Sequence, residues 1–131
     1  MSETIEKAMN LYITTTGRHS SESRFAHLWF GYEDGLVHLL SVVYENGRHT
    51  HWYENLRADP HCLLAVDGER YQAEVVAMAP DHATEQRIRE MIRTKYGDGP
   101  YRQWFGDDPM VPVIMRVTGP APHGVKATPY E

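Results

Sequence analysis

The sequence predicts a single, mainly β domain that closes into a small antiparallel barrel with accessory helices. Six segments rich in β-branched, aromatic or apolar residues have the character of strands, and only two or three segments favour helix. Short turn signals join neighbouring strands, which indicates hairpins rather than the long crossovers of a parallel sheet. Because 131 residues fit one domain, we expect one barrel over residues 1–131, with its core at about residues 11–118.

The N-terminal part of the chain predicts a short helix followed by the first strand. Residues 2–9 carry apolar side chains at the spacing of one helix face. Leu11–Thr16 is rich in β-branched and aromatic residues and stops at Gly17, so it predicts a strand. Residues 18–23 are polar, as expected of a turn.

The next two strands are expected at residues 24–32 and 36–43. The first contains a dense aromatic and apolar run, and Gly35 supplies the positive φ that the intervening turn requires. The second is apolar enough to be buried on both of its faces. A loop at residues 44–48 then leads to Thr50, which is a good cap for a short helix.

The second half of the chain predicts a hairpin, a longer helix and a final strand. The helix capped by Thr50 must end before Pro60, and His61–Val66 and Glu69–Met78 are strands joined by a two-residue turn. Asp81 caps a longer helix that stops at Gly97. Residues 111–117 form the sixth strand, and residues 119–131 are expected to be a loose tail.

Composition excludes several classes of function. The formal net charge of -5 argues against nucleic acid as a partner. No apolar run is long enough to cross a bilayer and the N-terminus lacks the pattern of a secretory signal, so we expect a cytoplasmic protein without an integral membrane segment. The single cysteine, Cys62, allows no intramolecular disulfide and is expected to be a small buried residue.

Motif searches exclude the commonest catalytic sites. The chain has 8 histidines, but His49, His51 and His61 do not have the spacing of a zinc site, so we expect no metal. The serines at positions 20, 21 and 23 lie in a turn and not in a Gly-x-Ser-x-Gly elbow. A Gly-x-Gly-x-x-Gly motif is also absent from the sequence, which argues against a Rossmann nicotinamide site.

Basic side chains gather in two neighbouring parts of this acidic chain. They are Arg18, His19, Arg24 and His27 around the first turn, and Arg48, His49 and His51 around the loop and start of the short helix. Arginine binds phosphate and carboxylate through paired hydrogen bonds, and the N–H groups at a helix start attract anions as well. The cluster predicts an anion site, with a solvated surface turn as the alternative.

Aromatic residues next to these segments have two interpretations. Trp52 can anchor the short helix to the barrel, and Asn55 can cap that helix or hydrogen-bond a neighbouring loop. Tyr96, Tyr101 and Trp104 follow the longer helix in what we expect to be a glycine-containing loop. They form either a wall against a flat ring or a lid over the core. The sequence leaves both interpretations open.

Three segments together resemble a known family. They are Thr14-Thr15-Thr16-Gly17-Arg18 followed by Ser20 and Arg24, then Trp52-Tyr53-Glu54-Asn55-Leu56-Arg57-Ala58-Asp59-Pro60, and finally Val111-Pro112-Val113. In this order and spacing they resemble the deazaflavin-dependent nitroreductase family. That family belongs to the split β-barrel flavin and deazaflavin proteins, which include pyridoxamine phosphate oxidase. The resemblance covers roughly residues 11–117.

The resemblance implies a fold, a cofactor and a set of site residues. It implies a six-stranded antiparallel split β-barrel of the FMN-binding type that binds coenzyme F420 and passes hydride to a quinone, an enone or a nitro compound. The cofactor contacts that it implies are Arg18, Ser20, Arg24, Ser41, Arg48, His49 and Trp52. Tyr96 and Tyr101 would face the acceptor, and one of them could donate a proton to it. Split-barrel relatives often pair, so a homodimer is also implied.

Departures from the family pattern leave the cofactor open. Ser21 stands where a typical member has glycine, and Val43, Tyr44 and Glu45 replace a glycine-rich segment that lets the backbone approach the phosphate. FMN is the alternative cofactor. The alternative of another class is a binding module that holds a flavin, haem or lipid without turnover. Oxidation of the reduced cofactor in the presence of an acceptor separates an enzyme from such a module.

Overall fold

The computed structural model describes residues 2–122 of the chain. The strands are β1 Leu11–Thr16, β2 Ser23–Leu28, β3 Gly31–Glu33, β4 Leu36–Val42, β5 His61–Val66, β6 Glu69–Met78 and β7 Met110–Pro120. The helices are α1 Ser2–Lys7, α2 His51–Ala58, α3 His82–Tyr96 and α4 Asp98–Trp104. The expected loose tail lies outside the described residues from residue 123 onward, and Pro120 itself still belongs to β7.

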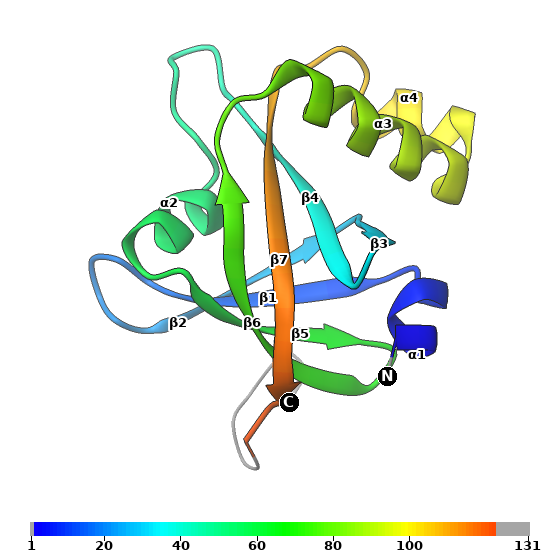
Figure 1. Cartoon of the computed structure of the whole chain (residues 1–131). Helices are drawn as coiled ribbons and strands as arrows, with labels where there is room; N and C mark the ends of the chain where they lie inside the picture. The colour runs from blue at the N-terminus through cyan, green and yellow to red at the C-terminus, as the bar shows by residue number, and fades with distance from the viewer. Residues whose placement is uncertain (1, 123–131) are drawn as a thin grey trace.

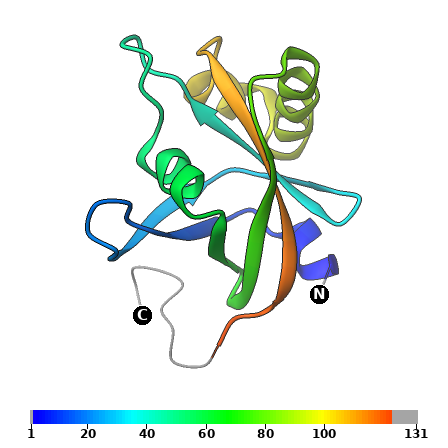
Figure 2. The ribbon, with the colours of Figure 1, turned by 60° about the vertical axis from the view of Figure 1, so that its left-hand side comes forward.

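All seven strands form one antiparallel sheet in the order β2-β1-β5-β6-β7-β4-β3. β6 and β7 are long, and irregular register between Gln72 and Ala73 and between Val75 and Ala77 marks bulges in their pairing. Bulges bend a strand and increase its twist. Figures 1 and 2 show the result, a sheet that curls so that β1 and β2 cross β7 at a steep angle. The prediction of a mainly β, antiparallel fold with few helices is confirmed.

The expected number of six strands is wrong, because the second expected strand divides into β2 and β3. β2 pairs only with β1, whereas β3 pairs only with β4 at the opposite edge of the sheet. The chain changes partners at Trp29 and Phe30. Gly31 then lies against Met91 of α3, where a Cβ would come within 2.7 Å of the methionine methyl group. A larger residue here would require the Met91 side chain to move.

Two apolar clusters stabilise the fold. The larger one fills the inside of the curled sheet and includes Phe30, Leu39 and Met115, which are fully buried. The smaller one lies between the sheet and α3, where Ile88 and Ile92 pack against Leu40 of β4. β4 therefore contributes to both clusters and is buried on both of its faces, as predicted.

The helices cover different parts of the sheet. α3 and α4 lie together across one end of β4 and β7, whereas α2 packs beside β1 and β2 (Figure 1). The bounds of α2 agree with the prediction, because Thr50 caps its N-terminus and the helix ends before Pro60. α4 was expected to be a loop. No helix in the described part of the chain is long and apolar enough to cross a membrane.

Candidate functional site

A cleft runs beside the outer strand β2, between this strand and the start of α2. One part of it, here called the basic half, has a volume of about 660 Å³. Its lining includes Arg18, His19, Ser20, Arg24, Phe25, Tyr44, His51, Trp52 and Asn55. None of the described residues that line this half carries a carboxylate. On a protein with a net charge of -5, this local excess of cations favours an anionic ligand.

The cleft continues into a second part, here called the apolar half, of about 470 Å³. Its lining includes Trp29, Leu40, Val42, Trp104, Phe105 and Met110. His27, Leu28, Thr50 and Trp52 line both halves, so the two halves lie next to each other. Trp104 is 67% exposed and is the most exposed of the large apolar side chains described. A cationic part next to an aromatic part suits a ligand with an anionic group and a flat ring.

The turn after β1 shapes the floor of the basic half. The Gly17 N–H donates to the Glu22 carbonyl over 2.7 Å, and the Ser21 N–H donates to the Gly17 carbonyl over 2.8 Å. A Cβ on Gly17 would come within 2.9 Å of the Ser20 hydroxyl oxygen, so the turn requires glycine there. Ser21 has φ 61°, the left-handed conformation that glycine favours. The turn thus forms although Ser21 replaces the glycine of the family pattern.

Asn55 holds Arg18 in the basic half. Its Oδ1 accepts hydrogen bonds from the Arg18 backbone N–H at 3.2 Å and from the Arg18 Nη1 at 2.8 Å. Its Nδ2 donates to the Thr15 hydroxyl at 3.0 Å, and the asparagine is only 1% exposed. A buried amide with both of its ends engaged is a rigid anchor. The structure therefore confirms the expectation that Asn55 bonds a neighbouring loop.

Arg24 lies at the beginning of β2 and has two partners in the preceding turn. Its Nη1 donates to Glu22 at 3.1 Å, and its Nη2 donates to the Ser20 hydroxyl at 3.2 Å. The ion pair with Glu22 is exposed, with side-chain exposures of 52% and 70% for Arg24 and Glu22. Exposed pairs of this kind contribute little to stability, so an anionic ligand can compete with Glu22 for the guanidinium.

The N-terminus of α2 forms the wall shared by both halves. The Thr50 hydroxyl accepts a hydrogen bond from the Tyr53 N–H at 3.3 Å and contacts the Ser41 hydroxyl at 2.7 Å. Ser41 is fully buried and is not among the lining residues, so it supports the wall from behind. The N–H groups of His51 and Trp52 precede the first intrahelical bond, which leaves them available to an anion.

Arg48 and His49, two of the expected phosphate contacts, do not line the cleft. Arg48 is exposed in the loop after β4, where its N–H donates to the Asn46 side chain at 3.0 Å. The His49 ring stacks on Tyr53 with 4.3 Å between ring centroids. From this loop, Tyr44 is the residue that reaches the basic half, whereas Glu45 is exposed and lies outside the lining.

Tyr96 lies behind the apolar half and not inside it. Its ring stacks on Trp29, with centroids 4.3 Å apart and planes 5° apart. Its hydroxyl donates to the Met9 carbonyl at 2.8 Å and accepts from the Phe30 N–H at 3.3 Å. Burial raises the pKa of Tyr96 to about 12. This tyrosine therefore positions Trp29 and does not present its hydroxyl to the cleft.

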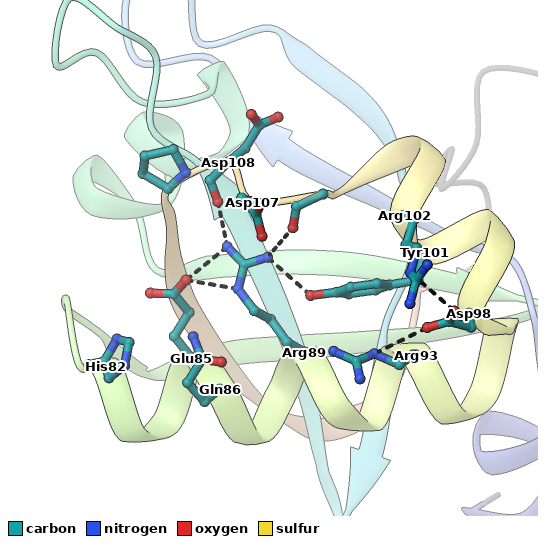
Figure 3. Close-up of a pocket in the computed structure, with 12 residues that line it drawn as sticks. His82, Glu85, Gln86, Arg89, Arg93, Asp98, Tyr101, Arg102, Asp107 and Asp108 are labelled. Atoms are coloured by element: carbon teal, nitrogen blue, oxygen red, sulfur yellow. Dashed lines mark hydrogen bonds and ion pairs between the residues drawn. The ribbon is translucent and has the colours of Figure 1, made fainter.

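Tyr101 belongs to a different pocket, which Figure 3 shows between α3 and α4. Its hydroxyl accepts a hydrogen bond from the Arg89 Nη1 at 3.1 Å. Arg89 is 7% exposed and also pairs with Glu85 and donates to the carbonyls of Gly106 and Asp108. With so many partners, Arg89 joins the two helices to the following loop. The side chain of Tyr101 is used in this network, away from the cleft.

The structure brings together some of the predicted residues and adds others. Arg18, Ser20, Arg24 and Trp52, four of the cofactor contacts that the resemblance implies, line the cleft together. His27 and His51 were part of the basic cluster but were not singled out, and Tyr44 was expected only to crowd the site. All three residues lie in or next to the basic segments, and this position is the only indication of their place that the sequence gives. Groups of three or more metal-ligating side chains are absent from the described residues.

Comparisons with known proteins address the family. A family model described as F420H(2)-dependent quinone reductase matches residues 1–117. A solved structure titled F420 reductase has a TM-score of 0.67 at 17% identity and covers 90% of this chain and 93% of that one. An FAD-binding protein from Mesorhizobium loti has a TM-score of 0.63 at 12% identity and covers 89% of this chain and 86% of that one. No curated protein matches the sequence.

A conserved hypothetical protein from Mycobacterium tuberculosis shares the fold as well. Its TM-score is 0.66 at 13% identity, over 99% of this chain and 91% of that one. These structural likenesses show the fold, whereas the family model covers most of the sequence and shows the family. The sequence-based prediction of a deazaflavin-dependent reductase is thereby confirmed: the chain belongs to the F420H2-dependent quinone reductase family.

Proposed function

We propose that the cleft is the F420 site of this reductase, and that the chain reduces a small flat acceptor such as a quinone, an enone or a nitro compound. The observation that carries the proposal is that a cationic half and an aromatic half of the cleft lie next to each other and share lining residues. The coenzyme has the matching parts, a phosphate with an acidic tail and a flat deazaflavin ring.

The residues of the cleft fit this coenzyme. Arg18 and Arg24 supply the cations for the phosphate and the acidic tail, and Ser20 adds a hydroxyl. Trp52 lies between the two halves and offers a flat apolar surface to the ring. Cofactor contacts of Arg48 and His49 stay a prediction. The geometry of the cleft does not favour it, because neither residue contributes to the lining.

The chemistry divides between coenzyme and protein. When bound, reduced F420 supplies a hydride. The protein binds the anionic groups in the basic half, and the aromatic side chains that line the apolar half offer flat apolar surfaces to the acceptor. Trp104 and Phe105 line the apolar half together with Trp52, so they should influence which acceptors are reduced.

Fluorescence titration of the cofactor-free protein tests the proposal. We expect saturable binding of F420 and weaker or no binding of FMN, which is run in parallel because it also has a phosphate and a flat ring. Binding of FMN alone would support the alternative flavin enzyme. Binding of F420, together with no oxidation of reduced F420 by any of the three acceptor classes, would support a non-catalytic binding module.

Arg24→Ala tests whether the basic half holds the phosphate. We expect F420 affinity to fall at least tenfold, which is about 1.4 kcal/mol, because a charge-assisted contact is lost. Arg116→Ala is the matched control, since Arg116 is also an exposed strand arginine paired with a glutamate, Glu74, but lies outside the cleft. Equal F420 affinities of the two variants would show that Arg24 does not contact the phosphate.

A homodimer is a further part of the proposal. A structural neighbour titled domain-swapped dimer has a TM-score of 0.62 at 18% identity and covers 82% of this chain and 80% of that one. β2 and β3 are the two edges of the described sheet, and such edges can pair with another chain. Light scattering on the purified protein would give its mass. A cytoplasmic location, expected from the sequence, stays a prediction.

A further inference from the structure

Four aromatic side chains form a row beside the apolar half of the cleft. Tyr96 stacks on Trp29, with 4.3 Å between the ring centroids. The Phe105 ring lies 5.6 Å from that of Trp29, and the Tyr101 ring lies 5.6 Å from that of Phe105. The two middle residues line the apolar half, whereas the tyrosines at the two ends of the row do not. The row thus consists of an inner pair, Trp29 and Phe105, and an outer pair, Tyr96 and Tyr101.

The packing of the inner pair places both rings in the wall of the cleft. Trp29 and Phe105 pack against the smaller apolar cluster, to which Leu40 and Met110 belong. Leu40 and Met110 line the apolar half as well. The inner pair is therefore part of one apolar wall with these two residues, and this wall is where a flat acceptor would stack.

The outer ring of Tyr96 is anchored to two other segments of the chain. Its hydroxyl donates to the Met9 carbonyl at 2.8 Å and accepts from the Phe30 N–H at 3.3 Å. Phe30 directly follows Trp29, so the second bond also fixes the backbone next to the inner pair. Because the planes of the Tyr96 and Trp29 rings are only 5° apart, the anchored tyrosine determines the orientation of the indole.

The outer ring of Tyr101 is anchored through the buried Arg89. Its hydroxyl accepts from the Arg89 Nη1 at 3.1 Å, and the same nitrogen donates to the Gly106 carbonyl at 3.1 Å. Gly106 directly follows Phe105, so one guanidinium holds both the ring beside Phe105 and the backbone after it. An ion pair with Glu85 at 2.8 Å fixes Arg89 in turn. Both ends of the aromatic row are thus tied to the fold.

We propose that Tyr96 and Tyr101 are positioning residues, which hold Trp29 and Phe105 in place and thereby determine how tightly the acceptor binds. The inference rests on the proposed function of the cleft and adds residues that lie outside its lining. A wall that is already in position loses little conformational freedom when a flat acceptor stacks on it, so more of the contact energy remains for binding.

A positioning role and a proton-donor role have different effects on the kinetics. The resemblance implies that one of the two tyrosines donates a proton to the acceptor. Loss of a proton donor would lower kcat and leave acceptor binding unchanged, and phenylalanine would be as harmful as leucine. Loss of a support would weaken acceptor binding, and leucine would be more harmful than phenylalanine because only phenylalanine keeps the ring.

The test compares Tyr96→Leu with wild type and with Tyr71→Leu, a control at a buried tyrosine of the larger cluster outside the cleft. The proteins are loaded with oxidised F420, which has no hydride to give, and titrated with a naphthoquinone by coenzyme fluorescence. We expect the quinone dissociation constant to rise roughly tenfold in Tyr96→Leu and to stay unchanged in Tyr71→Leu. F420 affinity should stay unchanged in both variants, because the basic half binds the anionic groups.

Tyr96→Phe and Tyr101→Phe keep the rings and remove only the anchored hydroxyls. They carry the test if the thermal transition of Tyr96→Leu shows incomplete folding. We expect a rise of roughly threefold in the quinone dissociation constant of each, and a matching rise in the acceptor KM at little change in kcat.

Two results would overturn the proposal. One is an unchanged quinone dissociation constant in the folded variants of Tyr96 and Tyr101. The other is a lower kcat at an unchanged dissociation constant in a phenylalanine variant, which would identify that tyrosine as a proton donor. Failure of wild type to bind F420 would instead overturn the function proposed for the cleft.

Discussion

At the scale of single residues, Asn55 links the fold to the site. Its carboxamide connects the turn after β1, through Arg18, to the Thr15 hydroxyl on the strand itself. Without this anchor, Arg18 would be a mobile surface side chain. It would then lose considerable conformational freedom when it binds a ligand. A buried amide that holds an arginine in place reduces that loss and so increases the affinity for an anion.

Asn55→Ala should weaken F420 binding although Asn55 carries no charge. We expect roughly a tenfold loss of affinity because Arg18 loses both of its anchors, and a lower free energy of unfolding because Thr15 loses a buried partner. Fluorescence titration and urea unfolding measure the two effects. Asn46→Ala is the control, since Asn46 bonds an N–H in an exposed loop. An unchanged affinity in Asn55→Ala would mean that Arg18 does not need its anchor.

At the scale of elements, the start of α2 is the part that connects the two halves of the cleft. The hydroxyls of Ser41 and Thr50 are 2.7 Å apart, and the Thr50 hydroxyl also caps the helix. The helix has only eight residues, so its position depends on this cap and on the burial of residues such as Trp52 and Leu56. A change in the cap should therefore disturb both stability and cofactor binding.

Thr50→Val and Ser41→Ala should show a non-additive effect on stability. Thr50→Val removes the cap and leaves the buried Ser41 hydroxyl without its partner, at a cost of about 1–2 kcal/mol. In the double variant the orphaned hydroxyl is gone, so its loss of stability should be smaller than the sum of the two single losses. Urea unfolding of the three variants measures this. Strict additivity would show that the Ser41–Thr50 contact contributes nothing.

The elements that the sequence did not predict were decided by contacts distant in sequence. Residues 24–32 have continuous strand character, and only the contact of Gly31 with Met91 and the pairing of β3 with β4 show where the strand divides. α4 contains Gly99 and Pro100, which suggest a loop, but proline is tolerated in the first turn of a helix. Short helices and partner changes of this kind leave little local signal in a sequence.

The candidate site was predictable where local chemistry determined it. Arg18, Ser20 and Arg24 belong to one turn, and a hairpin brings such residues together whatever the rest of the fold does. Tyr96 and Tyr101 are different, because they lie at the end of α3 and in α4, and the packing of these helices decides which side they face.

At the scale of the whole molecule, one buried cation makes stability depend on pH. The Lys95 Nζ lies 3.5 Å from the centre of the Phe30 ring and has no hydrogen-bond partner among the described residues. Burial lowers the pKa of Lys95 from 10.5 to about 8. Below pH 8 the lysine is charged in both the folded and the unfolded states, and the folded state bears the desolvation cost, which the ring face partly offsets.

Lys95→Met should therefore be more stable than wild type at pH 7, on the order of 1 kcal/mol. Between pH 8 and 10.5 the unfolded wild type holds the Lys95 proton that the folded state has lost, so wild-type stability rises with pH relative to the variant. The advantage of the variant should shrink over this range. Urea unfolding of both proteins from pH 7 to pH 10 measures the difference, and a constant difference would contradict the prediction.

The position of β7 in the sheet has a consequence for how the protein is made. β7 follows every other described strand in the chain, yet it lies between β6 and β4 and pairs with both. A ribosome therefore releases the rest of the sheet as two incomplete pieces, each with an open edge, before the strand that joins them emerges. The sheet can be completed only after that strand has emerged, so the open edges of β6 and β4 stay unpaired until the end of synthesis.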